Sequence, residues 1–379
     1  MRLKRKEGIL LYWIISWVIL ANLFILFRFG GINWSEDIFI LTQKEWIVLF
    51  GQATFVGLLS GILFGILDTN FRDNRYFRYR GFGSLVLTKT ITHFLIAVVI
   101  LFFGFFLAAL FNGYGIEGSF QRSLDFYSSF YFLVVLVYLL SSIMLLNFIL
   151  QVNDKFGPGN LWKLFFGRYY SPLEETRIFS FIDLRSSTKY AEILGHIKYS
   201  RLIQDCFVDI TPIIEQYEAE IYQYVGDEVV LTWRADRPDN YTNAVKAFYG
   251  FQNRISEKVS YYLDKYGLVP EFKAGMHVGL VIIAEVGIIK KEIAYHGDAI
   301  NTASRIQDEC NRFGKLLLCS GVFRSKLHKV DDLDFSLIGK TQLKGKTNPI
   351  DIYSVENKKS ALTSERRLFK KVNSDIVSL

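Results

Sequence analysis

Two segments decide the fold of the second half of this chain: RIFSFIDLRSST at residues 177–188 and EIYQYVGDEVVLTW at residues 220–233. In each segment an aspartate, Asp183 or Asp227, directly adjoins a run of strand-forming residues. A carboxylate at the end of an apolar strand lies at the edge of a sheet, where a ligand can reach it. Two such carboxylates on neighbouring strands make a site for a hard divalent cation such as Mg2+. The sequence therefore predicts a metal site between these strands.

A polar turn follows the first aspartate. It contains Ser186, Ser187 and Thr188, whose hydroxyl and amide groups suit the cap of the next helix or a cradle for phosphate. Apolar residues then recur at helical spacing and predict a helix over about 198–218, which Pro212 should bend.

The second aspartate lies at the turn of a predicted hairpin, and strands and helices alternate after it. This mixture predicts an α+β sheet covered by helices. A helix that starts near Asp298, as its N-cap, carries Asn301 and Arg305 four residues apart on one face. The other expected elements are a helix at about 240–263, a strand or strand pair in EFKAGMHVGLVIIAEVG, and strands at KLLLC, DFSLIG, QLKGK and IDIYSV.

The first half of the chain has a different composition. Hydrophobic residues make up 51% of the whole chain, and long uncharged runs are concentrated before about residue 153. An uncharged run of about 20 residues is long enough to span a bilayer. We therefore expect an all-α transmembrane domain of four helices over residues 1–153, with spans at about 8–28, 46–67, 87–111 and 126–152.

The basic residues, which give the chain its net charge of +7, indicate how the predicted spans are oriented in the membrane. Arginine and lysine gather at the N-terminus and in the 68–84 connection, whereas the connections after the first and third spans contain few of them. The positive-inside bias then places both termini and the second half in the cytoplasm, as a multi-pass protein of the inner or plasma membrane. No basic–aromatic module indicates nucleic-acid binding.

Two features of the predicted spans each allow more than one interpretation. The second span contains Gly51, Gly57, Gly61 and Gly65, the last three at four-residue spacing, which suits close helix packing or dimerisation. His93 in the third span is either an intramembrane sensor or ligand, or a histidine near the membrane interface.

Three regions complete the chain. Residues 154–176 form a short juxtamembrane linker, 177–356 a catalytic domain, and 357–379 a polar tail. The three cysteines have spacings that suit neither a zinc site nor a disulfide framework, so we expect free buried thiols.

Four motifs together resemble the catalytic domain of class III adenylate and guanylate cyclases. They are FIDLRSST, YVGDEV, HGDAINTASR and LKGK, in this order over about residues 176–356. The resemblance implies a ferredoxin-like central sheet with helices, and cyclisation of a nucleoside triphosphate with release of pyrophosphate.

The resemblance also implies roles for individual residues. Two divalent cations, Mg2+ or Mn2+, would be held by Asp183 and Asp227 beside the backbone of Leu184. Asn301 would orient the ribose and Arg305 would stabilise the transition state.

The phosphate chain would lie against Ser186, Ser187, Thr188 and Lys344. In this family the site lies between two catalytic domains, so one such domain per chain implies a homodimer, to which the membrane helices could add contacts.

The base-reading positions depart from the family pattern. Gln223 stands where adenylate cyclases usually have lysine, and Ala294 where an aspartate or threonine is common. Ser186 also replaces a usual glycine. We favour ATP as substrate, with GTP as the alternative. A second hypothesis is a non-catalytic membrane receptor or scaffold that binds nucleotide, and a third is a transporter with a regulatory domain, which the nearly uncharged spans argue against.

Overall fold

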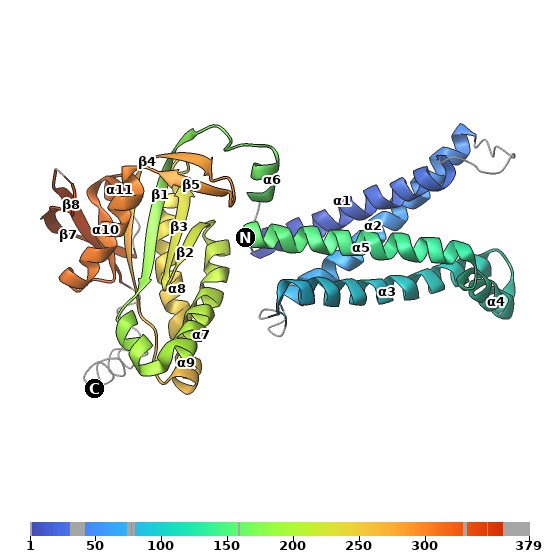
Figure 1. Cartoon of the computed structure of the whole chain (residues 1–379), viewed down its shortest axis with the longest axis horizontal. Helices are drawn as coiled ribbons and strands as arrows, with labels where there is room; N and C mark the ends of the chain where they lie inside the picture. Colours follow the sequence, from blue (N-terminus) through green and yellow to red (C-terminus); the bar gives the residue numbers. More distant parts are fainter. Residues whose placement is uncertain are drawn as a thin grey trace. The chain divides into compact units, whose positions relative to one another are not determined.

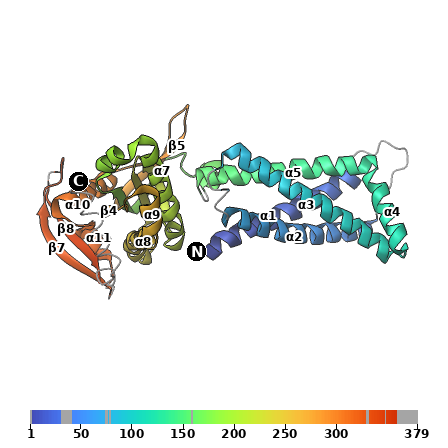
Figure 2. The ribbon, with the colours of Figure 1, turned by 90° about the horizontal axis from the view of Figure 1, so that it is seen from below.

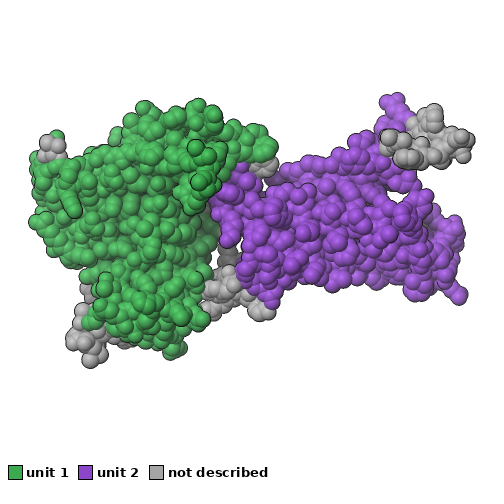
Figure 3. Space-filling view, in the orientation of Figure 1, with its two compact units in different colours: residues 1–2, 162–379 green, residues 3–161 purple. Residues whose placement is uncertain are grey.

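The computed structural model describes residues 2–30, 42–73, 77, 80–157, 160–328, 332–346 and 348–358. The chain divides into two compact units, residues 3–161 and residues 1–2 with 162–379, which we describe separately (Figure 3). The first predicted connection, parts of the basic 68–84 connection, and the predicted tail beyond residue 358 lie outside the described residues.

The unit of residues 3–161 is helical (Figure 2). Four of its helices are long and apolar enough to cross a membrane: α1 (Arg2–Gly30), α2 (Gln43–Asp73), α3 (Phe82–Phe111) and α5 (Phe130–Phe156). The amphipathic helix α4 (Gly115–Tyr127) precedes α5. Ser128 and Ser129 separate these two helices, and Ser129 caps α5, since its side chain accepts a hydrogen bond of 3.2 Å from the Phe132 amide.

The glycine stripe of α2 packs against α1 of the same chain. A Cβ at Gly61 would lie 2.4 Å from the Ile14 Cα, and one at Gly57 would lie 2.7 Å from the Val18 Cα. Gly51 faces open space. Of the two expectations for this stripe, close helix packing is thus confirmed as a contact within one chain.

Polar side chains are buried inside the helical unit. Asp68 is fully buried and forms ion pairs with Lys89 at 2.5 Å and with Arg72 at 3.0 Å. His93 is also fully buried, and its Nδ1 lies 3.3 Å from the Asn147 Nδ2. The side chains that hold α2, α3 and α5 together at this end of the unit are therefore charged as well as apolar.

The second unit contains one eight-stranded mixed sheet (Figure 1). The strands run in the order β2-β3-β1-β4-β6-β8-β7, and β5 pairs with β4. They are β1 (Leu173–Leu184), β2 (Glu220–Val225), β3 (Glu228–Arg234), β4 (Phe272–Val286), β5 (Glu292–His296), β6 (Leu317–Ser320), β7 (Leu333–Thr341) and β8 (Ile350–Asn357). The helices are α6 (Asn160–Phe165), α7 (Ser187–Gln216), α8 (Asp239–Ser256), α9 (Val259–Tyr266), α10 (Asp298–Phe313) and α11 (Gly321–Lys326). The expected α+β sheet with helices is confirmed.

Strand β1 lies inside the domain, and side chains on both of its faces are buried. Ile178 and Ile182 belong to a core shared with α7, α8 and α9, whereas Phe179 and Phe181 belong to a core shared with α10. Side chains alternate along a strand, so the next residue on the α10 side is Asp183. The alternation thus aims this carboxylate at α10.

Helix α7 contains Pro212 and is interrupted at Gly195, its one residue with non-helical dihedral angles. Three local predictions were wrong. The helix expected over 240–263 is divided into α8 and α9, and QLKGK forms a loop after β7 instead of a strand. Asp298 is the first residue of α10, and Gly297 occupies the N-cap position.

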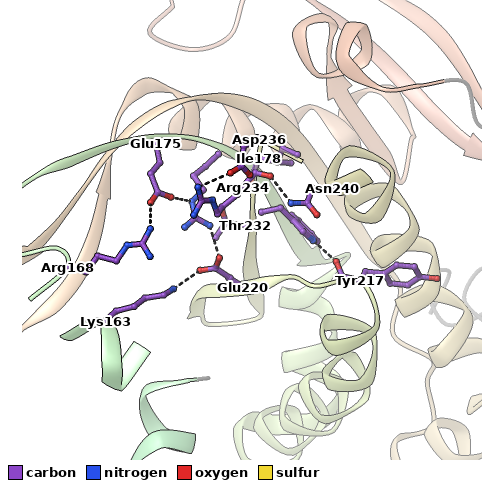
Figure 4. Close-up of polar contacts among 12 residues, drawn as sticks. Lys163, Arg168, Glu175, Ile178, Tyr217, Glu220, Thr232, Arg234, Asp236 and Asn240 are labelled. Atoms are coloured by element: carbon purple, nitrogen blue, oxygen red, sulfur yellow. Dashed lines mark hydrogen bonds and ion pairs between the residues drawn. The ribbon is translucent and has the colours of Figure 1, made fainter. Parts of the chain in front are cut away.

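A buried guanidinium fixes the start of β1. The Arg177 side chain is 1% exposed and forms ion pairs with Glu175 at 2.8 Å and with Glu220 of β2 at 3.0 Å. Lys163 reaches Glu220 at 3.3 Å, and Arg168 reaches Glu175 at 3.6 Å (Figure 4). The segment before β1 is therefore joined by charge to two strands of the sheet.

We expect Gly61→Ala to lower the unfolding temperature of the full chain in detergent. The added methyl group would collide with the α1 backbone, and overpacking of this kind costs typically about 1–3 kcal/mol. Tryptophan fluorescence during heating measures the effect. The control is Gly51→Ala in the same helix, which gains the same helix propensity without a collision. Equal unfolding temperatures for the two variants would contradict the α1–α2 contact.

We expect Arg177→Met to destabilise the full chain by about 3–5 kcal/mol, since it leaves two carboxylates without their buried partner. Arg234→Met is the control, because its 2.8 Å pair with Asp236 is about half exposed and should contribute about 0–1 kcal/mol. Burial favours a higher pKa for Glu220, but the charges and hydrogen bonds of Arg177 and Lys163 together outweigh burial, so the pKa of Glu220 is lowered. The stabilisation therefore holds above the pKa of an unfolded glutamate and fades as the pH falls below about 4. Chemical denaturation at several pH values measures both effects; a loss of stability that is independent of pH would contradict the ion pair.

Candidate active site

Asp183 lies at the end of β1, paired with β3 and β4. In register it faces Glu228 on β3 and Lys273 on β4. Its Oδ2 accepts a hydrogen bond of 2.9 Å from the Gln307 amide of α10 and lies 3.2 Å from the Lys273 ammonium. Burial and then the negative charge of Asp227 raise the pKa of Asp183, against the opposing effect of Lys273. The carboxylate is thus held in place and placed close to a second one.

Asp227 occupies the turn between β2 and β3, as the sequence predicts. Gly226 before it has φ of +61°, a left-handed conformation that glycine adopts without strain and that closes this short turn. The Asp227 Oδ2 is buried and has no hydrogen-bond partner within the described part of the chain. A buried carboxylate oxygen without a partner is costly unless a ligand satisfies it.

The surroundings of the two aspartates concentrate negative charge. Burial, together with Asp183, Asp308 and Asp227, raises the pKa of Glu228 to about 7. Burial and the charge of Asp227 raise the pKa of the Tyr199 hydroxyl to about 12. The site therefore favours a cation.

The donor set fits a hard divalent cation that arrives with its substrate. No group of three or more His, Cys, Asp or Glu side chains suited to a metal occurs within the described residues. Mg2+ is commonly held by one or two carboxylates together with substrate phosphates and water. Two carboxylates, one of them with a buried oxygen that lacks a partner, meet this requirement.

The predicted phosphate-binding turn directly follows Asp183. Ser186 has φ of +57°, which is rare outside glycine, and its side chain makes no capping hydrogen bond to α7. Ser187 is the first residue of α7, and Ser186 and Thr188 are exposed. The turn therefore presents a helix N-terminus next to the aspartates, which favours an anionic group.

Helix α10 carries the other predicted catalytic residues. Asn301 is exposed and Arg305 is partly exposed. A Cβ at Gly345 would lie 3.3 Å from the Arg305 guanidinium, so the Lys344–Gly345 turn and Arg305 lie side by side. Lys346 pairs with Asp298 at the start of the helix. The structure thus brings the predicted arginine next to the turn that carries the predicted phosphate-binding lysine.

The two groups of site residues belong to different elements of the chain. In the described part of the chain, no hydrogen bond or ion pair joins Asn301 or Arg305 to either aspartate. The two base-reading candidates come from different strands, Gln223 from β2 and Ala294 from β5. Their sequence neighbours Tyr222 and Tyr295 pack together, with ring centroids 4.8 Å apart.

Sequence reasoning missed two residues that touch Asp183. Lys273 is 6% exposed and Gln307 is 3% exposed. The lysine had a signal, since it interrupts an apolar strand in the segment EFKAGMHVG. The glutamine had none, because its position on the inner face of α10 follows from the packing of that helix on β4, where a Cβ at Gly275 would lie 2.2 Å from the Gln307 nitrogen.

Comparison with known proteins identifies this domain. Residues 169–357 match the family model of the adenylate and guanylate cyclase catalytic domain. Residues 169–357 belong to the class III nucleotide cyclases. The cyclase fold is also that of a bacterial light-regulated adenylyl cyclase of known structure, with a TM-score of 0.50 and 19% identity over 62% of this chain and 69% of that one.

Curated cyclases are similar in sequence. Adenylate cyclase 2 of Rhizobium meliloti (strain 1021) is 30% identical over 221 residues, which are 58% of this chain and 61% of the relative. The adenylate cyclase of Anabaena cylindrica is 27% identical over 181 residues, which are 46% of this chain and 36% of the relative. The chain thus spans less than two thirds of the length of either relative.

Proposed function

We propose that this chain is a membrane-anchored nucleotide cyclase. It would convert ATP, or GTP as the alternative, into a 3',5'-cyclic nucleotide and pyrophosphate for intracellular signalling. The observation that carries the proposal is the pair of carboxylates at the ends of β1 and the β2–β3 hairpin, one of which has a buried oxygen without a partner. Four apolar helices support a multi-pass anchor in the inner or plasma membrane, with both termini and the cyclase domain in the cytoplasm.

Each part of the reaction has a residue to perform it. Asp183 and Asp227, beside the backbone of Leu184, would hold two divalent cations, Mg2+ or Mn2+, which when bound supply charge neutralisation and activation of the 3'-hydroxyl. The turn at Ser186, Ser187 and Thr188 would hold phosphate oxygens through its amides.

The remaining residues act on the nucleotide from α10 and its neighbouring loop. Arg305 would stabilise charge that develops on the α-phosphate, and Lys344 beside it would bind the phosphate chain. Asn301 would orient the ribose, which positions the 3'-hydroxyl for attack. Lys273 would hold Asp183 in place while no cation is bound.

A homodimer would complete the site. Within the described residues of one chain, no hydrogen bond or ion pair joins Asn301 or Arg305 to the aspartates. Large side chains are exposed on β2 near Asp227: Tyr224 and Val225, which are 45% and 51% exposed. Such a surface is typical of a protein interface. A second copy would cover it and supply the complementary half of each site.

A complementation experiment tests the reaction and the dimer together. We expect full-length Asp227→Ala and Arg305→Ala each to lack turnover. When the two variants are co-expressed, about a quarter of wild-type turnover should return, since half of the dimers are mixed and each mixed dimer holds one intact site. Each of ATP, GTP, CTP and UTP is offered with Mn2+ or Mg2+, and mass spectrometry identifies the product.

Different outcomes separate the alternatives. If a wild-type dimer binds nucleotide but forms no cyclic product from any of the four, the non-catalytic receptor is favoured. The left-handed backbone of Ser186 and the unusual Gln223 are the features that motivate this alternative. Turnover by the wild type without recovery in the mixture would contradict the shared site but not the reaction.

We expect Lys273→Met to bind Mn2+ more tightly than the wild type when nucleotide is absent. The substitution removes the ammonium that neutralises Asp183 at 3.2 Å. A neighbouring unit charge changes the proton affinity of a carboxylate by about 10- to 1,000-fold, and we expect about a tenfold change in Mn2+ affinity. Electron paramagnetic resonance of free Mn2+ measures it on the full chain. Lys340→Met, remote in sequence on β7, is the control, and weaker Mn2+ binding by Lys273→Met would contradict the assigned role.

A further inference from the structure

The turn between β4 and β5 exposes two large apolar side chains. Ile288 is 94% exposed and Ile289 is 104% exposed, the highest values among the large hydrophobic residues of the chain that the structure describes. Lys290 and Lys291 follow them and pair with Glu292 and Glu285. Adjacent isoleucines at the tip of a projecting hairpin gain nothing from the core of their own domain, so another surface must account for them.

This turn lies where the chain from the membrane segment reaches the sheet. Leu173, the first residue of β1, pairs with Ile283, so β4 continues beyond the start of β1 toward the turn. The Glu285 amide donates a hydrogen bond of 2.9 Å to the carbonyl of Tyr169, which is itself buried. The turn and the segment before β1 therefore form one continuous edge of the cyclase domain.

The same edge exposes aromatic side chains. Phe165, Phe166 and Tyr170 are 76%, 76% and 80% exposed. The segment that carries them is fixed to the sheet, since Lys163 and Arg168 form ion pairs with the carboxylates that surround Arg177 (Figure 4). The aromatic rings thus point away from a segment that is itself held in place.

The chain itself restricts what this edge can meet. The last apolar helix ends at Phe156, and Tyr169 follows 13 residues later (169 − 156). Even fully extended, 13 residues span at most about 45 Å, and helix α6 shortens that reach. A short tether keeps the edge at a high effective concentration near the bilayer surface.

We propose that the Gly287–Lys291 turn, together with Phe165, Phe166 and Tyr170, is a lipid-contact surface that seats the cyclase domain on the bilayer. Isoleucine, aromatic rings and lysine in one patch suit the boundary between headgroups and acyl chains. The surface differs from the exposed side chains near Asp227 that we assign to a second copy. The inference rests on the proposed membrane anchoring, and it adds that the soluble domain binds lipid directly.

Seating this turn has a consequence for the active site. Strand β5 leaves the turn and runs directly into α10, which carries Asn301 and Arg305. Lipid contact at one end of β5 therefore acts on the strand that leads into the helix of the transition-state residues. The lipid surface is thus connected to the proposed site by one short strand.

A fluorescence experiment on the full chain tests the proposal. Ile289→Cys is labelled with an environment-sensitive dye in nanodiscs of phosphatidylcholine and phosphatidylglycerol. The three native cysteines are 0–1% exposed, and burial raises the pKa of Cys310 and of Cys319 to about 12, so they resist labelling. Leu337→Cys on the edge strand β7, where the native side chain is 58% exposed, is the matched control.

We expect the dye at residue 289 to emit at shorter wavelength and to be quenched several-fold more by doxyl lipids than the dye at residue 337. Adding Ile288→Asp should abolish most of that difference and increase quenching by iodide, because a charge is expelled from the acyl region. Equal lipid quenching at the two positions would overturn the proposal. Protection of residue 289 from both quenchers would also overturn it, because a protein surface would then cover the turn.

The experiment distinguishes this proposal from the anchoring on which it rests. Failure of the full chain to purify with nanodiscs would overturn the membrane anchoring, and the lipid contact with it. A chain that enters nanodiscs, but whose residue 289 stays in water, would overturn the lipid contact alone. Cyclase activity plays no part in either readout.

Discussion

The burial of both faces of β1 is the constraint on which the cyclase domain depends. Ile178 and Ile182 pack toward α7, α8 and α9, and Phe179 and Phe181 pack toward α10. A strand buried on both faces cannot slip by one residue without exchanging the two cores. Its register therefore fixes where Asp183 emerges and which neighbours it meets. The metal-binding role proposed for this aspartate is a consequence of core packing as much as of its own chemistry.

The two ends of β1 use charge in different ways. At its start, Arg177 lies buried between two glutamates, and all three groups are paired. At its end, Lys273 and Gln307 hold only one of two neighbouring aspartates, and the Asp227 Oδ2 has no partner within the described residues. A satisfied buried network holds a structure in one state, whereas an incompletely satisfied one favours a ligand. The contrast identifies the end of the strand as the place for chemistry.

How much could be predicted from the sequence depended on how local the signal was. The strand before Asp183, the hairpin around Asp227 and the helix with Asn301 and Arg305 were predicted, because each depends on neighbouring residues. Gln307 was missed, because its contact joins residues 124 positions apart. The QLKGK segment was predicted as a strand, but Leu343 anchors it as a loop in a core beside α10, so tertiary packing overrode local propensity.

The membrane half shows the same limit. The four long apolar helices could be predicted from composition alone, since a charge-free run of about 20 residues is typical of a membrane-spanning helix. The ion pair of Asp68 with Lys89 could not be predicted from composition. The two residues lie near the ends of different spans, where a charged residue is expected at the membrane boundary whether or not it is paired. Their pairing joins α2 and α3, and Arg72 extends it to Asp154 on α5 at 2.6 Å.

That network lies close in sequence to the tether. Asp154 precedes the end of α5 by two residues, and the chain continues from there to Lys163 and Arg168, which bind the carboxylates around Arg177. Charge pairs therefore hold the last turn of α5 to its neighbours in the helical unit, and other charge pairs hold Lys163 and Arg168 to the sheet. Each unit thus fixes its own end of the connection.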